Sequence, residues 1–115
     1  MSNKVFVGYD TREDIAFQVC EHSIKRYNQN VNVLPLIQHD LRQQKMYWRE
    51  LDKLASTEFT FTRFLVPHLM NFKGWALFID SDIIFLDDVD NLFALANDDF
   101  AVMCVKIGQA RGFAV

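Results

Sequence analysis

The first 37 residues carry a hydrophobic pattern that predicts a strand followed by a helix. Lys4–Tyr9 (KVFVGY) is almost continuously apolar and rich in β-formers, which is typical of a strand buried on both faces. Thr11-x-x-Asp14 has the form of a capping box, and helical spacing of apolar residues continues to about Asn28. The apolar positions of this predicted helix are Ile15, Ala16, Val19, Cys20, Ile24 and Tyr27.

A second apolar run completes a strand–helix–strand unit. Val31–Ile37 (VNVLPLI) predicts a strand, and Pro35 near its end indicates an edge position because proline lacks an N–H for the ladder. Such a unit is expected to form a parallel pair with a right-handed crossover. The polar stretch Gln38–Ser56 that follows is predicted to be mostly loop, with weak helical character.

The remaining pattern predicts two helical segments and two further strands. Residues 56–74 repeat apolar side chains at helical spacing, Pro67 is expected to break the helix and start a second one, and Gly74 closes it. Trp75–Asp80 and Phe100–Val105 are predicted strands on either side of a short helix, Val89–Ala96. This order predicts an α/β fold, Rossmann-like, with a mainly parallel sheet of about four strands and flanking helices.

Size and composition narrow the class of protein. The 115 residues, half of them hydrophobic and 11 of them Phe, fit a single globular domain spanning 1–115. A net charge of −3 argues against a nucleic-acid binder. Cys20 and Cys104 are too far apart for a metal motif, and neither a signal peptide nor a membrane-spanning run is present. We therefore expect a cytoplasmic protein.

Two carboxylates stand at the end of the third predicted strand, in the run "ALFIDSDIIFLDDVDNLF". Residues 80–99 hold seven of the chain's 15 acidic residues and no Lys or Arg, so compensating positive charge must come from another segment or a cation. If the segment is extended, Asp80 and Asp82 point to the same side and can share a hard divalent cation. The alternative is that Ser81 lies in a turn and both aspartates hydrogen-bond backbone amides.

Two other acidic motifs can be compared with the same residues. An EF-hand loop beginning at Asp80 requires glycine where Phe85 stands, which excludes that motif. A haloacid-dehalogenase-like phosphatase also carries strand-Asp-x-Asp, with Asp80 as nucleophile and Asp82 as acid/base. That motif normally follows the first strand and has Thr or Val where Ile84 stands, so the alternative stays open but is disfavoured.

Three segments in combination resemble a known family. "VFVGYDTREDIAFQVCEHSI", "STEFTFTRFLVPHL" and "GWALFIDSDIIFLDDVDNLF" occur in the order and spacing of the nucleotide-sugar-binding half of GT-A glycosyltransferases. The chain is most similar to the family 8 type and its bacterial and phage relatives, over residues 3 to about 106. The resemblance implies a hexosyltransferase that binds a UDP-sugar of the glucose or galactose type, with Mn²⁺ or Mg²⁺ as cofactor.

The resemblance also implies roles for individual residues. Asp80 and Asp82 correspond to the metal-binding Asp-x-Asp, with Asp80 and Ser81 also beside the nucleotide. Arg63 resembles the helix arginine that reaches toward the diphosphate, although an exposed helix arginine is the simpler interpretation. The wall around the base and ribose corresponds to the end of the first strand, namely Gly8, Tyr9, Asp10 and Thr11.

The match is incomplete at its end. Family members continue with a further strand, an acceptor site and a late histidine that completes the metal shell, whereas no histidine follows His68 here and residues 107–115 fit no family pattern. A third protein ligand and the catalytic residue for transfer are therefore not assigned, and a non-catalytic nucleotide-sugar-binding or assembly module remains an alternative. Without the family's later strand, Trp75–Asp80 has an open edge, so we expect either Phe100–Val105 to fill it or a homo-oligomer to form.

Overall fold

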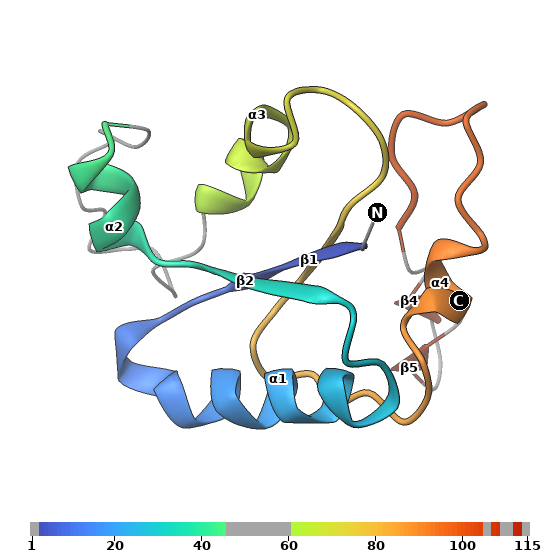
Figure 1. The fold of residues 1–115 in the computed structure, drawn as a ribbon, viewed down its shortest axis with the longest axis horizontal. Helices are drawn as coiled ribbons and strands as arrows, with labels where there is room; N and C mark the ends of the chain where they lie inside the picture. The colour runs from blue at the N-terminus through green and yellow to red at the C-terminus, as the bar shows by residue number, and fades with distance from the viewer. Residues whose placement is uncertain (1–2, 46–60, 105–106, 109–111, 114–115) are drawn as a thin grey trace.

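The computed structural model describes residues 3–45, 61–104, 107–108 and 112–113, and its centre is a three-stranded parallel sheet. The strand order is β2-β1-β3, so the first strand of the chain lies in the middle (Figure 1). The strands of this sheet are β1 (Lys4–Gly8), β2 (Asn32–Leu36) and β3 (Leu77–Ile79). The predicted α/β class and the parallel pairing of the first two strands are confirmed, and Pro35 lies on the edge strand as expected.

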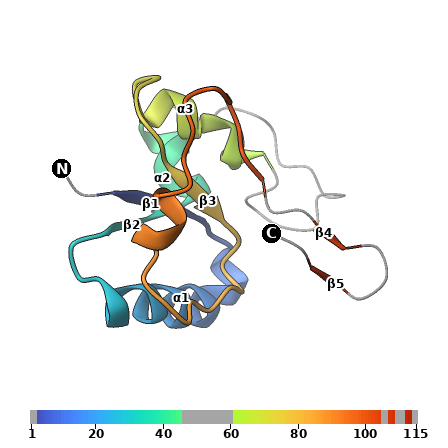
Figure 2. The same ribbon diagram turned by 90° about the vertical axis from the view of Figure 1, so that its right-hand side faces the viewer.

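Helices cover both faces of this sheet. The helical segments are η1 (Thr11–Glu13), α1 (Asp14–Tyr27), α2 (Gln38–Gln43), η2 (Thr62–Leu65), α3 (Val66–Leu69) and α4 (Asp90–Phe93). In Figures 1 and 2, α1 lies along one face, while α2 and α3 lie on the opposite face. A separate antiparallel pair, β4 (Ile107–Gly108) and β5 (Gly112–Phe113), was not predicted.

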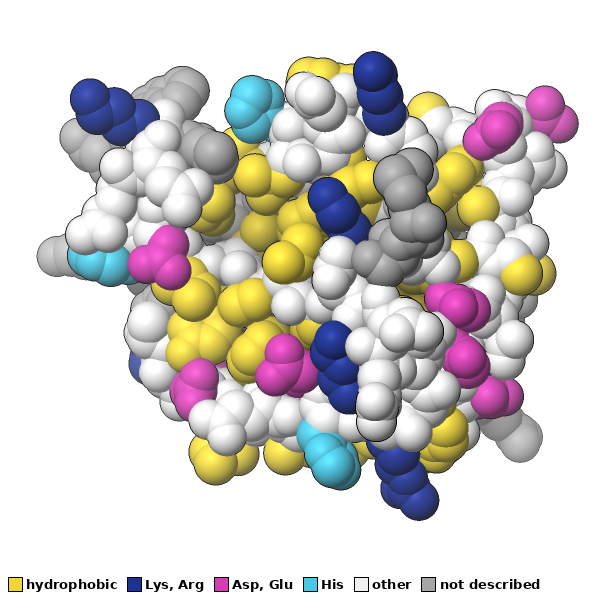
Figure 3. Space-filling view, in the orientation of Figure 1, with side chains coloured by type: hydrophobic (Ala, Val, Ile, Leu, Met, Phe, Trp, Pro, Cys, Tyr) yellow, Lys and Arg dark blue, Asp and Glu magenta, His cyan; other side chains and the backbone are white. Residues whose placement is uncertain are grey.

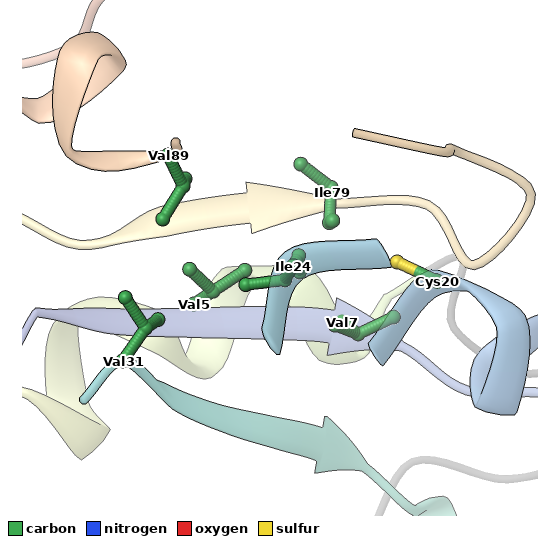
Figure 4. Packing of buried hydrophobic residues seen from close by; sticks show 7 residues of the cluster. All are labelled: Val5, Val7, Cys20, Ile24, Val31, Ile79 and Val89. Carbon is green, nitrogen blue, oxygen red and sulfur yellow. The ribbon is translucent and has the colours of Figure 1, made fainter. Parts of the chain in front are cut away.

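Side chains of β1 pack into two hydrophobic cores, one on each face of the sheet, because successive side chains of a strand point to opposite faces. Val5 and Val7 point toward α1, where they pack with Ile24 (Figure 4). The rest of that cluster consists of Cys20, Val31, Ile79 and Val89. Phe6 points the other way and packs with Leu36 and Leu41 beneath α2 and α3. Burial on both faces explains why β1 is almost continuously apolar.

The buried face of α1 differs from the predicted one. Cys20, Ser23 and Ile24 are buried, whereas Ile15 is 73% exposed and Val19 46% exposed. The helix carries more apolar positions than one face can hold, so the spacing alone could not identify which of them meets the sheet. The cap was also misassigned, because Asp10 rather than Thr11 accepts a hydrogen bond at the start of the helical segment.

The stretch after β2 was predicted as loop, yet it begins with a helix. Residues Gln38–Gln43 form α2, and Leu41 is buried against Phe6 and Leu36. One well-placed apolar side chain is enough to dock a short helix whose other positions are polar, because tertiary packing outweighs local propensity. The rest of the predicted loop, from residue 46 onward, lies outside the described residues.

Pro67 begins a second helical segment as predicted, whereas Gly74 does not close that segment, because α3 ends at Leu69. Pro67 lies in the first turn of α3, directly after the 3₁₀ segment η2. Gly74 has a φ of +74°, a left-handed conformation that suits glycine, and β3 follows within three residues. The turn between α3 and Gly74 is tight, since Asn71 and Phe72 also have positive φ.

The predicted fourth strand is not part of the sheet. Residues 100–104, the described portion of Phe100–Val105, adopt no strand conformation, and Val102 is 73% exposed. An apolar stretch becomes a strand only where it forms ladder hydrogen bonds, and residues 100–104 pair with no strand of this sheet. The sheet therefore has three strands instead of about four, and among the described residues nothing pairs with the outer edge of β3.

Some apolar surface remains on the face that carries β2. Figure 3 shows hydrophobic side chains at the surface between α1 and the helices on the other face of the sheet. Leu34 of the edge strand β2 is 37% exposed. No helix within the described residues is long and apolar enough to cross a membrane.

Candidate functional site

The candidate site lies where two neighbouring strands end. β1 and β3 are parallel, and Val7 is in register with Ile79, so the residues that follow each strand leave the sheet at the same edge. Adjacent strands are about 4.8 Å apart, which places Gly8 beside the start of the Asp80–Asp82 segment. Ligands of open α/β sheets bind at this carboxyl edge. The sheet therefore brings together the two segments that the sequence marked separately.

Gly8 and Tyr9 are held in place by their surroundings. Gly8 is buried at the end of β1. The Tyr9 hydroxyl donates a hydrogen bond to Asp14 over 2.6 Å, and its ring meets the Phe17 ring edge-on with centroids 5.6 Å apart. These contacts anchor Tyr9 to the first two turns of α1. The Tyr9 side chain is half-buried.

Asp14 is stabilised as a carboxylate by this arrangement. Hydrogen bonds from Tyr9 and then from Gln18 lower the pKa of Asp14 below its usual value, because both donors favour the charged form. Asp14 is also the first residue of α1, where a negative charge interacts favourably with the helix dipole. Tyr9, Asp14 and Gln18 thus form a small network beside the candidate site.

Asp10 is buried, and Arg12 covers it. One Asp10 carboxylate oxygen accepts hydrogen bonds from the Arg12 backbone N–H and Nε, each at 2.9 Å, and the other oxygen accepts from a terminal guanidinium nitrogen at 2.6 Å. The Asp10 side chain is only 1% exposed, whereas the Arg12 side chain is 66% exposed. Thr11 lies between them, exposed at the start of η1.

The Asp-x-Asp segment has a different backbone from the one expected. β3 ends at Ile79, and Ser81 and Asp82 lie in a turn, so the alternation that would point Asp80 and Asp82 to the same side does not apply. Ser81 is buried between two exposed aspartates. The alternative of Ser81 in a turn is correct for the backbone. The hydrogen bonds to backbone amides that it required are not present for Asp80 or Asp82 among the described residues.

The pKa of Cys20 is raised to about 11, chiefly by burial, with smaller contributions from the negative charges of Glu21 and Asp82. Cys20 is buried in the core between α1 and β1. A thiol with this pKa is protonated and unreactive at neutral pH.

The loop that follows Asp82 is tied along α1. The Ser23 hydroxyl accepts a hydrogen bond from the Phe85 backbone N–H at 2.9 Å and donates to the Cys20 carbonyl at 2.7 Å. Further along, the Asn28 side chain donates to Asp88 and Asp90. These contacts fix where the segment after β3 runs, and with it the position of the Asp80–Asp82 turn.

Arg63 lies over the strand that leads to the aspartates. Its guanidinium is 5.3 Å from the centroid of the Phe78 ring, a cation–π contact. Phe78 packs against the core cluster on the α3 side of the sheet. Arg63 is exposed. The Arg63 guanidinium therefore lies on the α3 side, beside the strand that leads to Asp80.

The oxygen ligands present suit a hard cation, but they are few. Asp80 and Asp82 are exposed carboxylates with no hydrogen bond or ion pair to another described residue. Within the described residues, no group of three or more His, Cys, Asp or Glu side chains is placed to hold a metal ion. Any cation at this edge would have to complete its shell with ligands other than these two carboxylates, such as water or phosphate oxygens.

Sequence reasoning missed Arg12. It identified Asp10 as a binding residue, yet the structure places Arg12 at the surface and Asp10 beneath it. The available signal was the Asp10-x-Arg12 spacing directly after a strand, because an aspartate in such a position commonly caps the following turn and can accept from a nearby arginine.

Comparison with known proteins gives one informative relative. Protein CDI of Arabidopsis thaliana is 53% identical over 104 residues, which cover 90% of this chain and 40% of the relative. This chain therefore spans less than half the length of that protein. No family model matches the sequence. No solved structure matches it either.

Proposed function

We propose that this chain is the nucleotide-sugar-binding part of a metal-dependent GT-A-type glycosyltransferase. Its ligand is a UDP-sugar of the glucose or galactose type, held with Mn²⁺ or Mg²⁺ at the carboxyl edge of the sheet. The observation that carries the proposal is the register of β1 with β3, which puts the Gly8–Thr11 segment beside Asp80 and Asp82. The family resemblance supplies the ligand class.

The residues of the edge divide into complementary parts. Asp80 and Asp82 would hold the cation, which neutralises charge on the diphosphate as the sugar–phosphate bond breaks. Arg63, stacked on Phe78, supports the same charge from the α3 side. Gly8, Tyr9, Thr11 and Ser81 line the approach to this edge from the two strand ends.

The residues described here do not identify the acceptor of the sugar. The relative is more than twice as long as the matched region of 104 residues. Binding of the nucleotide is the function that the described residues support directly. Transfer to an acceptor requires groups that position it against the sugar.

Titration calorimetry with UDP, with and without Mn²⁺, tests the proposal. We expect Mn²⁺ to raise UDP affinity at least about tenfold, since two carboxylates and a diphosphate share the ion. Asp82→Asn should abolish this gain. Asp99→Asn removes one exposed carboxylate outside the edge and is the matched control. UDP binding that is absent, or that ignores both Mn²⁺ and Asp82→Asn, would refute the assignment.

Two further assays separate the alternatives. Magnesium-dependent release of phosphate from an aryl phosphate, lost in Asp80→Asn, would support a phosphatase in which Asp80 is the nucleophile. Metal-dependent hydrolysis of a UDP-sugar would exclude a purely non-catalytic binding module. UDP binding without turnover of any donor would favour that module over the transferase.

A further inference from the structure

Asp10 is placed to support another residue more than to meet a ligand itself. Its side chain is 1% exposed, and both carboxylate oxygens accept from the Arg12 guanidinium. One of these oxygens also accepts the Arg12 backbone N–H, which fixes the carboxylate relative to the start of η1. A ligand hydroxyl would have to displace a paired guanidinium to reach this group.

Arg12 has the opposite character. The Arg12 side chain is 66% exposed, yet two of its guanidinium nitrogens donate hydrogen bonds to the two Asp10 carboxylate oxygens. A guanidinium held by a bidentate pair loses little further conformational entropy when it binds a second anion, because the fork is already oriented. Arg12 is therefore an exposed cation with a prepared orientation.

Arg12 also lies close in the sequence to the candidate edge. It follows the end of β1 by four residues, and β1 ends beside the strand that leads to Asp80 and Asp82. Residues 80–99 contain no Lys or Arg, so positive charge for an anionic ligand must come from other segments. Arg63 approaches from the α3 side. Arg12 approaches from the end of β1.

We propose that Arg12 is a ligand-binding residue that contacts the diphosphate, and that Asp10 is the residue that positions it. This inference rests on the proposed function and moves the binding role that the sequence suggested for Asp10 to Arg12. A second arginine can strengthen binding of a nucleoside diphosphate, because the charge of the diphosphate is spread over several oxygens. Bidentate contacts to phosphate favour Arg over Lys.

The test compares ligands with and without phosphate. UDP, UMP and uridine are titrated into the wild type, Arg12→Gln and Arg12→Lys in the presence of Mn²⁺. We expect Arg12→Gln to weaken the affinity for UDP roughly 10- to 100-fold, as for loss of a charge-assisted hydrogen bond. The affinity for uridine should change less than about twofold. Arg12→Lys should lose less UDP affinity than Arg12→Gln, because lysine keeps the positive charge. Arg26→Gln, an exposed arginine near the far end of α1, is the charge-matched control.

A double-mutant cycle tests the positioning role of Asp10. Asp10→Asn should weaken UDP, and the effect of Arg12→Gln should then shrink because the two residues act together. Thermal melts of each variant confirm folding. Equal losses for UDP and uridine, or UDP binding unchanged by Arg12→Gln, would overturn the inference while the proposed function stands. Failure of the wild type to bind UDP would overturn both.

Discussion

Truncating Ile24 and Ile15 to alanine distinguishes the buried face of α1 from the face that its sequence suggests. Both residues are isoleucines in the same helix, and both occupy predicted apolar positions. Ile24 is completely buried, whereas Ile15 is 73% exposed. The pair therefore differs in environment while the chemical change is identical.

The magnitude follows from burial. Ile24→Ala removes three carbons from contact with Val5, Val7 and the rest of the cluster, a transfer loss of roughly 2.4 kcal/mol at about 0.8 kcal/mol each. The cavity adds about 1 kcal/mol, and the better helix propensity of alanine offsets about 0.4 kcal/mol. We expect a net loss of about 3 kcal/mol in the free energy of unfolding. For Ile15→Ala the small transfer loss and the propensity gain nearly cancel.

Urea unfolding followed by circular dichroism measures both changes, with thermal melts as a second readout. The midpoint temperature of Ile24→Ala should fall by about 10–15 °C, and that of Ile15→Ala by less than about 2 °C. Equal losses for the two variants would refute the packing of α1 described here. They would favour instead a helix rotated so that Ile15 also meets a core.

Three further predictions concern reactivity, pH and association. Cys104 is exposed and should react quickly with a thiol reagent at pH 8, whereas buried Cys20 should react only on unfolding. The pKa of Cys20 is raised to about 11 in the folded protein. The stability that Cys20 contributes should therefore fall as pH rises from about 9 to 11. Tyr9→Phe should raise the lowered pKa of Asp14, measured by NMR titration, and reduce the stability that is present at neutral pH and lost as pH falls through that pKa. The outer edge of β3, which pairs with no strand in the part of the chain that the structure describes, predicts a homo-oligomer. Light scattering at micromolar concentration tests this, and a stable monomer that binds UDP would contradict it.

The sheet could be predicted where pattern and topology agree. Lys4–Gly8 is apolar at every position except its ends, and that property belongs to a strand covered on both faces. Phe100–Val105 has a similar apolar content, but a strand also needs an edge with which to pair. Pairing depends on the whole fold, so the local pattern could not show that residues 100–104 stay outside the sheet.

The candidate site was predictable as a set of segments but not as a set of roles. The spacing of Asp80 and Asp82 after a strand identified the edge, and the helical pattern left Arg63 exposed. The turn at Ser81 and the pairing of Asp10 with Arg12 depend on backbone angles that neighbouring contacts decide. Such local geometry is not encoded in hydrophobic periodicity.

The central position of β1 has a consequence for when the sheet can be completed during translation. β1 and β2 lie close together in the sequence, with α1 between them, so this unit can form early during translation. β3 begins about 40 residues after β2 ends, which corresponds to roughly 2–8 seconds of synthesis. During that interval one full edge of β1, the most buried strand of the sheet, has no partner on the nascent chain. Ribosome-associated chaperones that shield such edges should therefore matter more for this protein than its small size suggests.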